Sequence, residues 1–204
     1  TPAEDTLIAA TKAGVLAEIG TTVPTTKTKD VLIRAPLLRY LILGGCDDCR
    51  TETAGVRVRG AWIANMLDLS FAKAVGPIGF FACHIAEQPL MLQLQLQLPL
   101  LALNGSTLSN GLNAQGAQIG GDVILRGVTA KGEVCLAGAM ITGQMDCEGA
   151  TLEKEGRPAL NAEGAQIGDS VFLSGVTAKG EVRLSGATIT GQLACEGARL
   201  ENEG

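Results

Sequence analysis

An internal duplication is the feature of this sequence that most constrains its fold. Residues 112–156 and 160–204 align at an offset of 48, and 33 of the 45 paired positions are identical. The 12 differences fall mostly between regularly spaced apolar positions, among which only Met145 and its counterpart Leu193 differ. One set of side chains is therefore fixed and the alternate set varies, which is typical of strands with one buried face.

A shorter period runs inside each copy. Apolar pairs of the form A-x-I and V-x-L recur, and their first members, from Ala117 to Ala150, are spaced 6, 5, 6, 5, 6 and 5 residues apart. Glycines follow the same rhythm, where the chain must turn and where positive φ is useful. Each unit is a short strand and a corner that cannot bury its own face, so the pattern predicts a solenoid.

The alternation of small and large pairs indicates the number of sides in one coil. Small sides stack on small sides, and large on large, only if the number of sides per coil is even. A coil with two sides would have almost no interior. We therefore predict a mainly β fold, a right-handed four-sided β-helix with about 22 residues per coil. The predicted columns are Ile119–Ile141–Ile167–Ile189, Ala130–Leu152–Ala178–Leu200 and Leu125–Cys147–Leu173–Cys195.

In the last two columns large and small side chains alternate, which would fill a narrow core to native density. Two segments interrupt the period. The insertion Glu153–Ala159 is expected to bulge out as a loop. Residues 89–101 (PLMLQLQLQLPLL) alternate Leu with Gln without corner glycines, so their register as one strand would be poorly specified. One extra residue in this segment would keep the later coils in register with the earlier ones, because Cys83 then stacks on Ser106 at an offset of 23 instead of 22.

The chain divides into a cap with a connector, residues 1–54, and a solenoid, residues 55–204. Residues 3–19 are amphipathic and predict a helix that covers the first coil, since a bare β-helix end is an open sheet edge.

A short extended piece, VLI at 31–33, precedes a second helix, which begins at Pro36 and ends at Gly44–Gly45. Arg34 and Arg39 could anchor the cap on acidic groups, but solvated surface charge is the favoured interpretation.

Composition limits the function classes. The chain is 46% hydrophobic with 3% aromatic residues, which suits a thin core of aliphatic side chains. A net charge of −5 argues against direct nucleic-acid binding through phosphates. The sequence has no run of 18 apolar residues and no signal-peptide pattern, so we expect no membrane span and a cytoplasmic location.

The six cysteines do not suggest a disulfide framework. Cys147 and Cys195 share a column but lie two coils apart, which is too far to bridge. Cys83 is expected to face inward and Cys135 outward. Free thiols in a reducing cytoplasm are the favoured interpretation.

A C-x-x-C motif, Cys46 to Cys49, could hold half a zinc site or a redox dithiol. The sequence has no second C-x-x-C and a single histidine. A loop with two free thiols is therefore favoured over a metal or redox role.

His84 is the obvious catalytic candidate. The period places it outward, above Trp62 and below Thr107, without an acid or nucleophile patterned around it. We favour a surface histidine. The threonine column that continues from Thr107 is too narrow for an ice-binding array, so it is interpreted as cross-strand stabilisation.

Acidic side chains also fail to form a pattern. Arg126 would stack on Glu148 as a ladder pair, and Glu133 and Glu181 share a face but lie two coils apart. We therefore predict no catalytic, cofactor-binding or metal site. The outward acids, scattered over different columns, are Asp122, Asp146, Glu148 and Glu196.

Several units resemble the pentapeptide-repeat consensus of a small residue, a polar one, Leu or Phe, and two small or polar ones. They are ATITG, AMITG, AQIGD, STLSN, CHIAE and AWIAN. The resemblance covers roughly residues 55–204 but only alternate sides, because the V-x-L sides carry an extra residue. It implies a right-handed β-helix, and some members of that family mimic duplex DNA and bind type II topoisomerases.

A longer pattern, IRAPLLRYLILGG followed by GVRVRGAWIANMLDL and GGDVILRG, resembles uncharacterised bacterial proteins often labelled membrane-associated oxidoreductases. That label implies a redox site, and the sequence carries no nicotinamide or flavin fingerprint to support it.

The favoured function is a non-catalytic scaffold that presents rigid outer faces to a protein partner. A DNA-mimicking topoisomerase-binding protein ranks second, because dense acidity on one face is required and basic residues are interleaved. An oxidoreductase is the third alternative.

The sequence ends at Glu201-Asn202-Glu203-Gly204 without a capping helix, which would leave the last coil open. We expect either that the native chain continues with further coils or, less favoured, that a homodimer forms through the C-terminal coil. The column Lys131–Glu153–Lys179–Glu201 would place Glu201 at this rim.

Overall fold

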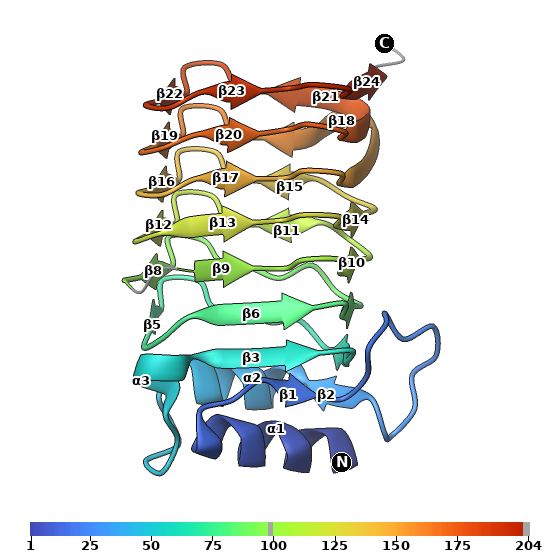
Figure 1. Cartoon of the computed structure of the whole chain (residues 1–204), viewed down its shortest axis with the longest axis vertical. Helices are drawn as coiled ribbons and strands as arrows, with labels where there is room; N and C mark the ends of the chain where they lie inside the picture. Colours follow the sequence, from blue (N-terminus) through green and yellow to red (C-terminus); the bar gives the residue numbers. More distant parts are fainter. Residues whose placement is uncertain (98–99, 202–204) are drawn as a thin grey trace.

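The computed structural model describes residues 1–97 and 100–201. It is a parallel β-solenoid that rises from an N-terminal helical cap and winds as a right-handed helix (Figure 1). Successive coils pair at an offset of 22 residues, as in the pairing of Thr107 with Thr129. The predicted fold class is confirmed.

Each coil has four faces, which we number in chain order. The first face contains β1 (Ala17–Glu18), β3 (Val56–Arg59), β6 (Ile78–Phe81), β9 (Leu100–Ala102), β13 (Asp122–Ile124), β17 (Met145–Asp146), β20 (Val171–Phe172) and β23 (Leu193–Ala194). The fourth contains β5 (Lys73–Ala74), β8 (Gln95–Leu96), β12 (Gln118–Ile119), β16 (Met140–Ile141), β19 (Gln166–Ile167) and β22 (Thr188–Ile189).

The second and third faces are joined, because two long strands run around the corner between them. The second face contains β2 (Leu32–Arg34), β4 (Trp62–Ala64), β7 (His84–Ile85), β10 (Thr107–Leu108), β14 (Thr129–Ala130), the first parts of β18 (Thr151–Asn161) and β21 (Thr177–Arg183), and β24 (Arg199–Glu201). The third contains β11 (Leu112–Asn113), β15 (Val134–Cys135) and the later parts of β18 and β21.

The core is a stack of columns whose register matches the prediction. Ile119, Ile141, Ile167 and Ile189 pair in turn along the fourth face. On the second face Ala130, Leu152, Ala178 and Leu200 pair in the same way, so large and small side chains alternate.

The loop predicted over Glu153–Ala159 is wrong. These residues belong to β18, whose pairing with β21 slips from Glu153↔Lys179 to Leu160↔Val182. The four extra residues form a long bulge within a paired strand, because the flanking backbone keeps its hydrogen bonds to the next coil. Gly180 lies opposite at φ 128°, where a Cβ would come within 2.3 Å of the Lys154 carbonyl oxygen.

The Leu/Gln segment is not one long strand, as its alternation suggested. A turn at Leu92–Gln93 divides it, and only Gln95–Leu96 of the alternating run forms β8. The extra residue is confirmed, since His84 pairs with Thr107 at an offset of 23. The offset returns to 22 at Leu100, which pairs with Asp122, so the extra residue lies between Leu96 and Leu100, a stretch that includes the undescribed residues 98–99.

Helix α1 (Pro2–Ala13) is shorter than the predicted 3–19 helix. Gly14 ends it in the left-handed conformation at φ 72°, and its N–H bonds to carbonyls of the last turn. The following residues Ala17–Glu18 form β1, which pairs with β3. The apolar residues after Gly14 therefore keep the spacing typical of an amphipathic helix although they are not helical.

The predicted extended piece and second helix are confirmed as β2 and α2 (Ala35–Ile42), and a short helix, α3 (Thr51–Ala54), leads into β3. Leu7 of α1 and Leu38 and Leu41 of α2 are buried in the same cluster as the coil core. Strands β1 and β2 extend the first and second faces, so the cap shares both core and sheets with the coils.

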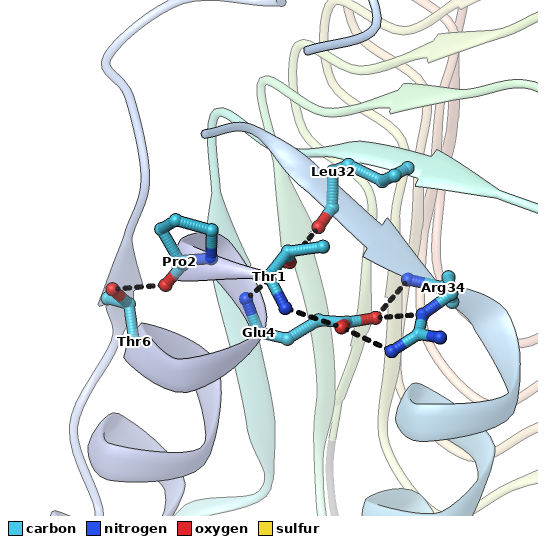
Figure 2. A network of polar contacts seen from close by, with 6 residues as sticks. All are labelled: Thr1, Pro2, Glu4, Thr6, Leu32 and Arg34. Carbon is cyan, nitrogen blue, oxygen red and sulfur yellow. Dashed lines mark hydrogen bonds and ion pairs between the residues drawn. The ribbon is translucent and has the colours of Figure 1, made fainter. Parts of the chain in front are cut away.

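An ion pair between the exposed Arg34 and the buried Glu4 fastens α1 to the start of α2 (Figure 2). Arg34 donates from Nε to Glu4 Oε1 at 2.8 Å and from Nη2 to Oε2 at 2.7 Å, and its backbone N–H also bonds Oε1. The Glu4 side chain is 4% exposed. The interpretation of Arg34 as solvated surface charge is therefore wrong. Arg39 instead donates to the backbone carbonyl of Asp68.

We predict that Glu4→Gln destabilises the protein by about 3 kcal/mol at pH 7. The hydrogen bonds from Arg34 lower the pKa of Glu4 from 4.5 to about 2, against the opposing effect of burial. A depressed carboxyl pKa stabilises the fold above the unfolded value and loses that effect as the pH falls toward the folded value. The difference between parent and variant in urea unfolding should shrink between pH 4.5 and pH 2. A pH-independent difference would contradict this account.

We further predict that Ala139→Leu costs about 1–3 kcal/mol, because it overpacks the fully buried column Ala117–Ala139–Ala165. Thr142→Ala, on the exposed outer surface, should change the free energy of unfolding by less than about 0.5 kcal/mol. Denaturant unfolding of the two variants provides the comparison, and equal midpoints would show that the faces are assigned wrongly.

Candidate functional site

His84 lies on the outer surface of the second face, as predicted, between Trp62 and Thr107. Its ring stacks on Trp62 with centroids 3.7 Å apart, and its Nε2 lies 3.1 Å from Ser109 Oγ. Burial, with a smaller effect of Lys131, lowers the pKa of His84 and so favours the neutral imidazole. Ser109 was not predicted as a partner of His84, although it lies two residues beyond Thr107, which pairs with His84 at the offset of 23.

This pair has a base and a hydroxyl but lacks the third group of a catalytic triad. Within residues 1–97 and 100–201, no carboxylate is hydrogen-bonded to His84. A nucleophilic serine needs a base that is itself oriented by a third group. The stacking on Trp62 and the hydrogen bond with Ser109 hold the imidazole in place on the outer surface.

Two of the predicted outward acids, Asp146 and Glu148, pair with one base. Arg126 contacts Glu148 at 3.5 Å, as predicted, and also binds Asp146 through Nε. Asp146 was predicted as an outward acid, but its side chain is fully buried. Its other oxygen accepts the backbone N–H of Glu148.

The second copy of the duplication lacks both partners of this buried pair. Ser174 stands where the first copy has Arg126, and Ala194 where it has Asp146. Loss of Arg126 alone would leave the buried Asp146 carboxylate without its partner, so an Asp146 counterpart without a basic partner would be costly.

We predict that Arg126→Ser destabilises the protein by about 2–4 kcal/mol, because it leaves Asp146 buried and unpaired. The double variant Arg126→Ser/Asp146→Ala should be more stable than Arg126→Ser alone, since it introduces the serine and alanine that the second copy has at these two positions. Urea unfolding of the parent, both single variants and the double variant measures the coupling. Additive effects would refute it.

Glu133 and Glu181 do not act together. Glu133 accepts a hydrogen bond from Asn161, whereas Glu181 pairs with Arg183 at 2.8 Å. The hydrogen bond from Arg183 lowers the pKa of Glu181. Each is thus a local surface contact, and across the described residues no group of three or more His, Cys, Asp or Glu side chains is arranged to hold a metal.

The cysteines comprise one disulfide and four free thiols, of which Cys83 and Cys147 are buried. Cys83 faces inward, as predicted, and burial raises the pKa of both Cys83 and Cys147 to about 12, so neither thiol ionises at pH 7. Cys135 is half-buried on the outer surface, as predicted.

The prediction of free thiols at Cys46 and Cys49 is wrong, because the two form a disulfide. The Cys49 N–H donates to the Cys46 carbonyl, and this turn brings the two Cα atoms within 5.3 Å. Both sulfurs lie beside a cleft of about 440 Å³. Its walls are Leu43, Gly44, Cys46, Asp47, Cys49, Arg50, Thr51, Thr53 and Val75.

A shallow uncharged groove follows the fourth face from β8 to β22. It consists of two hollows of about 290 and 300 Å³ that share Met140 and Thr142. Gly120 lines one hollow and Gly168 the other, on either side of Thr142. The outward side chains along it are Gln95, Gln118, Met140, Gln166 and Thr188.

The last described coil exposes residues that are buried one duplication earlier. Leu193 is 48% and Leu200 57% exposed, whereas their counterparts Met145 and Leu152 are buried. Cys195 is likewise exposed.

Comparison with known proteins adds no family: no family model, curated protein or solved structure matches this chain. Among the described helices, none is long and apolar enough to cross a membrane.

Proposed function

We propose that this protein is a non-catalytic scaffold that binds a protein partner along the groove of the fourth face. The observation that supports this function is the continuous, uncharged surface across five successive strands. Met140, at its centre, is 47% exposed. Exposed apolar side chains within a polar rim are typical of interaction sites.

The solenoid gives this surface rigidity. Each groove strand from β8 to β19 is hydrogen-bonded to a strand of the coil before it and of the coil after it. The inward residues of these strands, Leu96, Ile119, Ile141 and Ile167, are buried. A preformed surface binds without first losing conformational freedom. The lack of charged side chains in the groove favours an uncharged segment of the partner.

Photo-crosslinking tests this function. A photo-reactive residue at Gln118 should yield a discrete adduct in cells, and Met140→Glu should abolish that adduct by placing a desolvated charge in the interface. A photo-reactive residue at Thr129, on the second face, serves as the matched control and should yield none. Equal adducts from both faces, or an adduct that persists in Met140→Glu, would refute the fourth face as the binding surface.

A DNA-mimicking function through topoisomerase binding is the second candidate, supported by the pentapeptide-like units and the net charge of −5. It has weaker support, because Glu148, Glu153 and Glu181 each contact a basic side chain. Loss of DNA supercoiling by gyrase at micromolar protein would favour it. A homodimer through the C-terminal coil and a cytoplasmic location stay predictions.

A further inference from the structure

We propose that Cys46 and Cys49 form a redox-active site that undergoes thiol–disulfide exchange with a dithiol. This inference does not depend on the scaffold function, because it concerns the cap and not the fourth face.

The disulfide closes a very short loop, with a sequence separation of 3. In the chain-entropy account a disulfide stabilises less as its loop shortens, so this one restrains the unfolded chain little. Other contacts already hold the two ends of the segment. The Arg50 N–H bonds the Thr11 carbonyl of α1, and the Val75 N–H bonds the Ile42 carbonyl of α2. The cap can therefore keep its fold when the disulfide opens.

Access separates this pair from the buried cysteines. Cys46 and Cys49 are each partly exposed and both line the cleft, whereas Cys83 and Cys147 are fully buried. An incoming thiolate must approach a sulfur directly for exchange to occur, so exposure in a cleft is the geometry that the reaction needs.

One basic side chain lines the cleft, and a second pairs with an acid between the two cysteines. Arg50 follows Cys49 directly and lines the cleft. Lys12 contacts Asp48 at 3.5 Å and so offsets one of the two carboxylates between the cysteines. Nearby positive charge favours the thiolate form of a cysteine, which is the leaving group when the disulfide opens.

The exchange balances as a two-electron transfer. One thiolate of the dithiol attacks a sulfur of the Cys46–Cys49 bond, forms a mixed disulfide and displaces the other cysteine as a thiolate, which takes a proton from water. The second thiol of the reductant loses its proton and attacks the mixed disulfide, which releases the remaining cysteine. The products are two cysteine thiols and an oxidised, disulfide-bonded reductant.

The test is reduction of insulin disulfides by dithiothreitol in the presence of substoichiometric full-length chain. We expect the parent to accelerate the reaction, and Cys46→Ser and Cys49→Ser to lose the acceleration. Cys195→Ser, which removes an exposed free thiol, is the matched control and should keep it. No acceleration by the parent, or equal acceleration by all variants, would overturn the proposal.

A second measurement avoids reliance on the variants' folding. The parent is exposed to dithiothreitol without denaturant, its free thiols are alkylated, and the peptide containing residues 46–49 is weighed by mass spectrometry. We expect this peptide to be doubly alkylated while the far-ultraviolet circular dichroism spectrum is unchanged. A disulfide that opens only when the protein is denatured would overturn the proposal.

Discussion

The structure depends on one constraint: each side of a coil must lie in register with the same side of the next coil. Most strands are two or three residues long and bury one or two side chains, so none is stable alone. Stacking satisfies the backbone groups of neighbouring coils and builds a continuous core at the same time. A one-residue slip would turn the buried side chains outward, which explains why the inward positions of the duplicated copies are almost identical.

Much of this fold could be predicted because the constraint is written in the sequence as a period. The alternating spacing of 6 and 5 residues indicates four sides, and it places His84 outward and Cys83 inward. The offset of 23 across the Leu/Gln segment follows from the same count. Local interruptions were less predictable, because an insertion such as that in β18 can be absorbed by a paired bulge as well as by a loop.

Features that the period does not cover were missed. Glu4 and Arg34 lie 30 residues apart in the aperiodic cap, so only the packing of α1 against β2 brings them together. The apolar residues after Gly14 mimic a longer helix. A C-x-x-C spacing fits a dithiol and a disulfide equally, and the local turn decides between them. The contact of Ser109 with His84 is diagonal between columns, where a count of directly stacked residues does not find it.

Deletion of whole coils tests the register most directly. Removal of residues 118–165 takes out 48 residues, which is the offset of the duplication, and joins Ala117 to Gln166. Every column then stays in register, and Arg126 and Asp146 are removed together. We expect this protein to remain a β protein that unfolds cooperatively. Small-angle scattering should show its long axis shortened by two coils, about 10 Å. Removal of residues 118–170 takes out one further side and should abolish cooperative unfolding. Equal behaviour of the two deletions would contradict the four-sided register.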